Sequence, residues 1–165
     1  MLLNHQAALD YVLNKPDYFR ELTVQKILEI HRFLTKGLGI PNKIRAGRVG
    51  ITGTNYKPLA KANQIQKALQ DLCDLINSKR NVLEKAFIAL LLIAYIQPFE
   101  DGNKRTARII CNALLLPNKY CPISFRTVEP EDYRYATLLF YEQNSIPSFK
   151  KIFMEQLEFS TANYF

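Results

Sequence analysis

Cysteine, histidine and glycine are scarce in this sequence of 165 residues, and tryptophan is absent. The three cysteines, Cys73, Cys111 and Cys121, include no Cys-x-x-Cys pair, which fits reduced thiols in the cytoplasm and gives no metal framework. The two histidines, His5 and His31, have no ligand-type neighbours at metal-binding spacing, so we expect no zinc site. The low glycine content, beside abundant Leu, Ile, Ala, Lys and Gln, favours helices over strands.

Long apolar runs are also lacking. The longest, residues 86–96, is too short to cross a bilayer and is typical of a buried helix. No signal peptide, internal repeat or low-complexity segment is evident, so we expect a cytoplasmic protein with no membrane partner. With 48% hydrophobic and 22% charged residues, the chain has the balance of one globular domain over residues 1–165.

Acidic residues are outnumbered, since 22 Lys and Arg face 15 Asp and Glu, which gives a net charge of +7. Such an excess is compatible with a nucleic acid, an acidic partner or a phosphorylated ligand. The basic residues are scattered along the chain rather than clustered, so the charge alone does not favour nucleic acid.

Apolar periodicity predicts an all-α fold, a compact helical bundle. We expect helices over residues 5–13, 23–35, 63–76, 83–96, 103–116, 129–143 and 148–158. Residues 83–96 are apolar almost all round, which places that helix at the centre of the bundle. Only residues 48–57 resemble strands, because two alternating stretches flank the turn at Gly53-Thr54; there we expect a small β-hairpin.

Residues 97–108 carry the chemistry, because they join the most buried helix to the start of a new one. Free N–H groups and the helix dipole make such a start ready to bind anions, and Gly102 allows a tight turn there. Lys104, Arg105 and Arg108 occupy the first turns, where cations oppose the dipole unless a polyphosphate completes the site. Asp101 offers the hard oxygen ligand that Mg²⁺ prefers. A plain helix corner with a solvated basic first turn is the alternative.

This segment resembles the motif of the Fic (Fic/Doc) family, His-x-Phe-x-Asp/Glu-Gly-Asn-Gly/Lys-Arg-x-x-Arg. Seven positions match it in register: Phe99, Asp101, Gly102, Asn103, Lys104, Arg105 and Arg108. The expected hairpin resembles the family's flap, which lies over the site, through Arg45, Val49, Ile51, Gly53, Tyr56 and Pro58. The resemblance covers a core of about residues 4–153, with the flap at about 48–57 and a phosphate loop at 97–108.

The resemblance implies a protein adenylyltransferase, which moves AMP from ATP to a hydroxyl side chain of a target protein. Asp101 would hold Mg²⁺, while Asn103, Lys104, Arg105 and the amides around Gly102 would bind the nucleotide. Arg108 would orient the terminal phosphate. The flap would dock the target by strand addition, through Val49, Ile51, Gly53 and Tyr56.

Two positions depart from the pattern of adenylylating members. Lys104 stands where many of them have glycine, and lysine there is found in Doc-type relatives that transfer phosphate. Gln97 stands where the family has its catalytic histidine, and an amide cannot accept the proton of the target hydroxyl. A positioned base contributes on the order of 10²–10⁴-fold, so we expect intact nucleotide binding with weak or absent transfer.

Three alternatives therefore stay open: an impaired adenylyltransferase, a non-catalytic pseudoenzyme that binds a nucleotide or partner, and a Doc-type phosphotransferase toxin component. The family's inhibitory helix motif, Ser/Thr-x-x-x-Glu-Gly/Asn, has no match in the sequence. Either that helix is lost or cut off, or a separate antitoxin supplies it.

Overall fold

The computed structural model describes residues 1–164, and these contain seven α-helices and no β-strand. In chain order the elements are α1 (Leu2–Asn14), the 3-10 helix η1 (Pro16–Phe19), α2 (Val24–Thr35), α3 (Ala62–Ser78), α4 (Val82–Ile96), α5 (Asn103–Leu115), the 3-10 helix η2 (Leu116–Asn118), α6 (Pro130–Gln143) and α7 (Pro147–Tyr164). The expected all-α fold is therefore confirmed.

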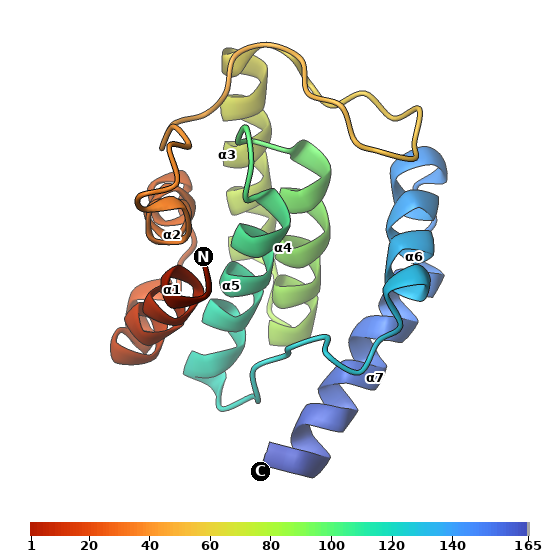
Figure 1. The fold of residues 1–165 in the computed structure, drawn as a ribbon. Coiled ribbons are helices and arrows are strands. Elements are labelled where there is room, and N and C mark those ends of the chain that lie inside the picture. The colour runs from red at the N-terminus through yellow and green to blue at the C-terminus, as the bar shows by residue number, and fades with distance from the viewer. Residues whose placement is uncertain (165) are drawn as a thin grey trace.

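Helix α4 lies at the centre of the bundle, as its apolar sequence predicts. Asn81 caps its start by accepting hydrogen bonds from two main-chain N–H groups. The helix ends at Gln97, which adopts the left-handed conformation (φ 52°) just before Pro98. Packing against α5 is more extensive than any other contact between helices, and the two run side by side (Figure 1).

The remaining helices cover this central pair. Helices α1 and α2 pack on one side of α5, while α3 packs against α4 (Figure 1). Helices α6 and α7 pack on each other and lie on the far side from α1 and α2. The turn between α4 and α5 thereby reaches one end of the bundle, where residues 36–61 pass over it; we call these residues the crossing segment.

The expected β-hairpin at residues 48–57 is wrong, because this part of the crossing segment contains no strand. Between the two limbs of the segment only one main-chain hydrogen bond forms, from Gly47 N–H to Ala60 C=O (2.9 Å). The returning limb instead bonds to α6: the carboxylate of Glu142 accepts from Thr54 Oγ1 (2.7 Å) and Asn55 N–H (3.2 Å). An isolated pair of strands is only marginally stable, and here the returning limb is bonded to α6 in place of the other limb.

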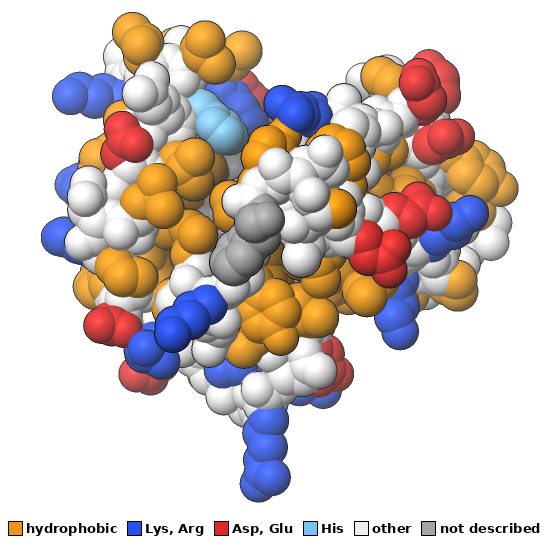
Figure 2. All heavy atoms as spheres, turned by 90° about the horizontal axis from the view of Figure 1, so that it is seen from below, with side chains coloured by type: hydrophobic (Ala, Val, Ile, Leu, Met, Phe, Trp, Pro, Cys, Tyr) orange, Lys and Arg blue, Asp and Glu red, His pale blue; other side chains and the backbone are white. Residues whose placement is uncertain are grey.

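The opposite end of the bundle has a mixed surface, with acidic, basic and hydrophobic side chains interspersed (Figure 2). None of the helices in residues 1–164 combines the length and the apolar character needed to span a membrane. The central helix α4, the most apolar of them, is covered by protein rather than presented on the surface.

Candidate functional site

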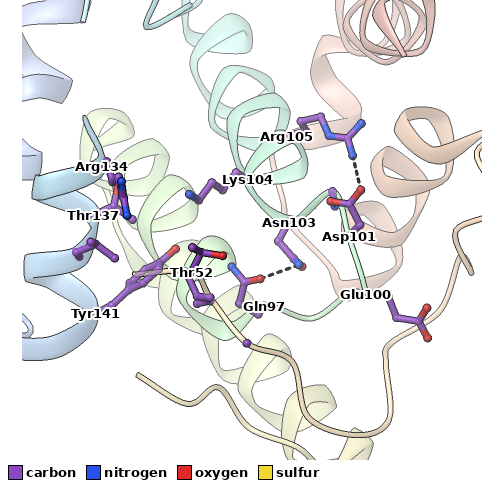
Figure 3. A pocket seen from close by; sticks show the side chains of 14 residues that line it. Thr52, Gln97, Glu100, Asp101, Asn103, Lys104, Arg105, Arg134, Thr137 and Tyr141 are labelled. Carbon is purple, nitrogen blue, oxygen red and sulfur yellow. Dashed lines mark hydrogen bonds and ion pairs between the residues drawn. The ribbon is translucent and has the colours of Figure 1, made fainter. Parts of the chain in front are cut away.

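A cavity of about 530 Å³ lies where three parts of the chain meet. Its walls come from the crossing segment, the 97–105 turn and the inner face of α6 (Figure 3). Seven of the residues singled out in the sequence line it: Ile51, Gln97, Asp101, Gly102, Asn103, Lys104 and Arg105. The fold thus brings the two sequence motifs, flap and loop, to one place.

The turn at Gly102 is held against α2 by His31. Gly102 has φ +86°, and a Cβ there would meet the His31 ring at 3.4 Å, so both conformation and space favour glycine. His31 stacks on Phe99 with ring centres 3.7 Å apart, and its Nε2 lies 3.0 Å from the Asp101 carbonyl oxygen. His31 is fully buried, so its ring packs in the core and also fixes the turn.

The Asn103 side chain closes the turn on itself. Its Oδ1 accepts from the Phe99 N–H (2.9 Å), and its Nδ2 donates to the Phe99 carbonyl (2.9 Å) and to Gln97 Oε1 (3.0 Å). Both N–H donors of the amide are therefore engaged within the protein. The groups left to bind a ligand in the cavity are the first N–H groups of α5, which have no partner inside the helix.

Gln97 is bound into the same network rather than left free in the cavity. Besides accepting from Asn103, it donates from Nε2 to the Ala94 carbonyl (2.6 Å), in the last turn of α4 (Figure 3). Its left-handed backbone carries the chain from α4 into the turn. The side chain thus links the end of one helix to the start of the next.

Arg45 anchors the loop from the opposite side, a role that the sequence did not reveal. The residue is 1% exposed, and its guanidinium donates to the carbonyls of Gln97 (2.6 Å) and Gly47 (2.7 Å). Its main-chain N–H also donates to the Pro98 carbonyl (3.0 Å). Burial lowers its pKa from the usual value. Arg45 matches the flap pattern in the sequence, but the sequence does not indicate that it binds Gln97, which is 52 residues away.

Cations approach the cavity from two elements. Arg105 on α5 pairs with Asp101, with Nη2 3.0 Å from Oδ2, and Lys104 points toward the cavity (Figure 3). Desolvation lowers the pKa of Lys104, and the positive charges of Arg108 and Arg134 lower it further. Arg134 projects from α6, and sequence reasoning missed it because nothing in the α6 sequence indicated which face meets the loop.

Arg108 lies next to the cavity but does not line it. Its guanidinium carbon is 5.0 Å from the ring centre of Tyr133 and 5.4 Å from that of Phe125. The Nε of Arg108 and the Nη1 of Arg105 are buried, and neither has an acceptor among the residues that the structure describes. Two buried guanidinium donors without acceptors point to a site completed by an anion.

The expected flap residues divide into two groups. Ile51 lines the cavity, and Gly53 packs against the guanidinium of Arg134. Val49 and Tyr56 do not line it. The Tyr56 ring stacks on Tyr95 with centres 4.4 Å apart, and burial raises the pKa of its hydroxyl, which donates to the Tyr95 carbonyl (2.9 Å). Tyr56 therefore anchors the segment, and its docking role stays a prediction.

The site fits a polyphosphate better than a metal ion alone. The start of α5 and the three cations that line the cavity, Lys104, Arg105 and Arg134, suit phosphate oxygens. The buried donors Arg105 Nη1 and Arg108 Nε, which have no acceptor among the described residues, suit them too. In residues 1–164 no group of three His, Cys, Asp or Glu side chains could enclose a metal. Asp101 supplies one carboxylate, and Mg²⁺ commonly takes one or two carboxylates together with phosphate oxygens.

The profile of the Fic/DOC family matches residues 21–115 of the chain. The sequence is 26% identical over 151 residues to protein adenylyltransferase fic-1 of Caenorhabditis elegans, covering 87% of this chain and 29% of that protein. It spans less than a third of the length of the curated adenylyltransferases that it matches.

Solved structures show the same fold. Residues 134–508 of C. elegans Fic-1 superpose with a TM-score of 0.77 at 22% identity, over 95% of this chain and 49% of that one. BepC of Bartonella tribocorum, solved with bound AMPPNP, gives 0.68 at 17% identity, over 93% and 85%. IbpAFic2, solved with adenylylated Cdc42, gives 0.69 at 20% identity, over 93% and 53%.

Proposed function

The chain belongs to the Fic/DOC family, and from that premise we propose that residues 1–165 form a single Fic domain that binds ATP with Mg²⁺ in the cavity beside Gln97. The distant homology to protein adenylyltransferases makes transfer of AMP to a hydroxyl side chain of a target protein the proposed reaction. Relatives solved with bound AMPPNP and with adenylylated Cdc42 support the nucleotide and the kind of acceptor.

The observation that carries the proposal is the pair of buried guanidinium donors, Arg105 Nη1 and Arg108 Nε, beside a helix start. A phosphate chain at this place would accept from them and from the first N–H groups of α5. Gly102 keeps the turn compact enough for that approach. Lys104 and Arg134 add positive charge from opposite sides of the cavity.

Asp101 is the residue placed to help hold Mg²⁺. Its Oδ1 accepts from the Gly102 N–H (2.6 Å), which fixes the carboxylate at the turn, and its Oδ2 pairs with Arg105. If phosphates attract Arg105, the carboxylate can turn from the arginine to the metal. The bound ion would neutralise charge on the phosphates; the chain's own task is to orient them.

Gln97 leads us to propose that transfer is impaired. Its amide cannot accept a proton near neutral pH, and both its polar groups already bond to Ala94 and Asn103. Electrostatic stabilisation and positioning, the other large contributions to phosphoryl transfer, do not need this side chain. A pseudoenzyme that only binds nucleotide is the second candidate, and Lys104 makes phosphate transfer of the Doc type the third.

Nucleotide binding is tested by titrating Mg-ATP into the protein in a calorimeter. A hydrogen bond to a charged group contributes about 1.5–3 kcal/mol, so Arg105→Ala and Arg108→Ala should each weaken binding by roughly 10- to 150-fold. Lys79→Ala is the matched control, because Lys79 pairs only with the exposed Glu84. Equal losses in all three variants would refute the assignment of the site.

Transfer is tested by restoring the base with Gln97→His and incubating the protein with a cell lysate. Labelling from α-labelled ATP should rise on the order of 10²–10⁴-fold over the unmodified chain. Label arriving only from γ-labelled ATP would indicate phosphate transfer instead. If both forms bind Mg-ATP and neither transfers a label, the pseudoenzyme becomes the better account.

A further inference from the structure

The basic residues are spread along the chain, but the acidic residues are not, and residues 30–70 lack them altogether. This stretch carries eight of the 22 Lys and Arg residues and none of the 15 Asp and Glu residues. The rest of the chain has 14 basic and 15 acidic residues, so it is close to neutral. The uneven distribution of acidic residues is not apparent from the composition of the whole chain. Residues 30–70 account for the entire net charge of +7.

Most of these cations are exposed and unpaired. Arg45 is buried and Lys67 pairs with Asp71, whereas the other six are exposed and form no ion pair with any described residue. The six are Arg32, Lys36, Lys43, Arg48, Lys57 and Lys61. They lie on the end of α2 and along the crossing segment up to the start of α3, and we call this set the basic face. The crossing segment runs across one end of the bundle (Figure 1). The opposite end of the bundle mixes both signs of charge (Figure 2).

The basic face adjoins an unpaired stretch of main chain. The N–H and C=O groups of residues 48–50 make no hydrogen bond to any residue that the structure describes. Gly50 and Ile51, at the end of that stretch, line the cavity beside Gln97. Extended main chain with free N–H and C=O groups pairs readily with another extended peptide.

We propose that the basic face binds an acidic, extended segment of a partner protein, which pairs with the main chain of residues 48–50 and presents its hydroxyl to the cavity. This inference rests on the proposed function, and it adds the chemical class of the acceptor: a Ser, Thr or Tyr flanked by Asp or Glu. Arg48 belongs to the docking stretch itself, and the other five cations lie along the crossing segment or at the end of α2 without an ion pair. Together they attract an acidic segment and disfavour a basic one.

The surface suits a peptide better than a single-stranded nucleic acid. Nucleic-acid grooves of this kind combine cations with exposed aromatic rings on which bases stack. The crossing segment contains one aromatic residue, Tyr56, and its ring already stacks on Tyr95 while its hydroxyl bonds to the protein. An unpaired peptide main chain, by contrast, is a partner for another peptide main chain.

The experiment uses three fluorescent peptides with the same central serine, flanked by glutamate, glutamine or lysine, and a labelled 20-nucleotide DNA strand. Fluorescence anisotropy measures binding to the full chain at low and high salt. The variant Arg48→Glu with Lys57→Glu reverses two charges of the basic face. The control, Lys119→Glu with Lys150→Glu, makes the same change in net charge at exposed positions elsewhere. Mg-ATP titration accompanies every protein.

The glutamate peptide should bind more tightly than the glutamine peptide, and the lysine peptide least. Exposed charge pairs contribute about 0.2–1 kcal/mol each, so the loss of two such pairs should weaken binding of the glutamate peptide by roughly twofold to thirtyfold, whereas the control variant should not weaken it. Equal binding of the three peptides, or an equal effect of the control, would overturn the inference, as would tighter binding of the DNA strand. Loss of Mg-ATP binding with peptide preference retained would instead contradict only the proposed function.

Discussion

Replacing Arg45 by methionine tests whether this buried cation holds the loop in place. Methionine keeps much of the side-chain length and removes the guanidinium. In the native protein that group donates to the carbonyls of Gln97 and Gly47 at 2.6 and 2.7 Å, and no carboxylate lies against it. Its charge is balanced instead by the carbonyl end of α4, where the helix dipole is negative.

The magnitude follows from what the substitution leaves behind. Two carbonyls lose their donor, and an unsatisfied buried polar group costs about 1–3 kcal/mol. Removing the charge recovers part of its desolvation cost, which is visible in the lowered pKa of Arg45. The expected net loss for Arg45→Met is about 2–4 kcal/mol, a large share of the roughly 5–15 kcal/mol that stabilises a typical domain.

Urea unfolding followed by circular dichroism measures this loss, with Arg80→Met as the control, because Arg80 is exposed. The control should change the free energy of unfolding by less than about 0.5 kcal/mol. Below the unfolding transition, Arg45→Met should also weaken Mg-ATP binding, because the loop that carries the nucleotide site loses its anchor. A change in stability as small as the control's would refute the anchoring role of Arg45.

Three further predictions concern other parts of the chain. Glu142→Gln should speed amide hydrogen exchange in residues 48–57, because Glu142 holds this segment through its hydrogen bond to Thr54. The same hydrogen bond lowers the pKa of Glu142 in the folded protein. The stabilisation that the carboxylate contributes is therefore present above the unfolded-state pKa, and it should be lost as the pH falls through the lower folded-state pKa. Gly53→Ala should lower the unfolding free energy by about 1–2 kcal/mol in urea, since φ is +88° and the new Cβ would lie 2.6 Å from Arg134 Nη2. Burial raises the pKa of Cys73 to about 12, so its thiol should resist Ellman's reagent at pH 8 until the protein unfolds.

The helices could be predicted from the sequence because their signals are local. Thr23 caps α2 by accepting from a main-chain N–H, and Pro130 opens α6, both as local rules require. The expected start of α5 after Gly102 is correct, and its end differs by one residue. The last helix runs to Tyr164 rather than residue 158, because no proline or glycine stops it.

The crossing segment could not be predicted, because its conformation depends on distant residues. Alternation around Gly53 suggested a hairpin, but whether two limbs pair depends on what else their polar groups meet. Glu142, 88 residues after Thr54, takes the returning limb to α6. Arg45 meets its loop partner across 52 residues. Neither contact can be recognised from the neighbouring sequence, although both hold segments that line the cavity.

The network around Gln97 explains why nucleotide binding and proton transfer can be separated in this fold. The turn is held by Asn103, Arg45 and His31, none of which depends on a basic side chain at position 97. Gln97 itself contributes two hydrogen bonds and a left-handed backbone to that turn. Under the proposed function, a chain without the base thus retains the shape and charge of the nucleotide site. Selection for nucleotide binding alone would preserve the residues that shape the loop. It would not preserve a proton acceptor at position 97, and Gln97 does not supply one.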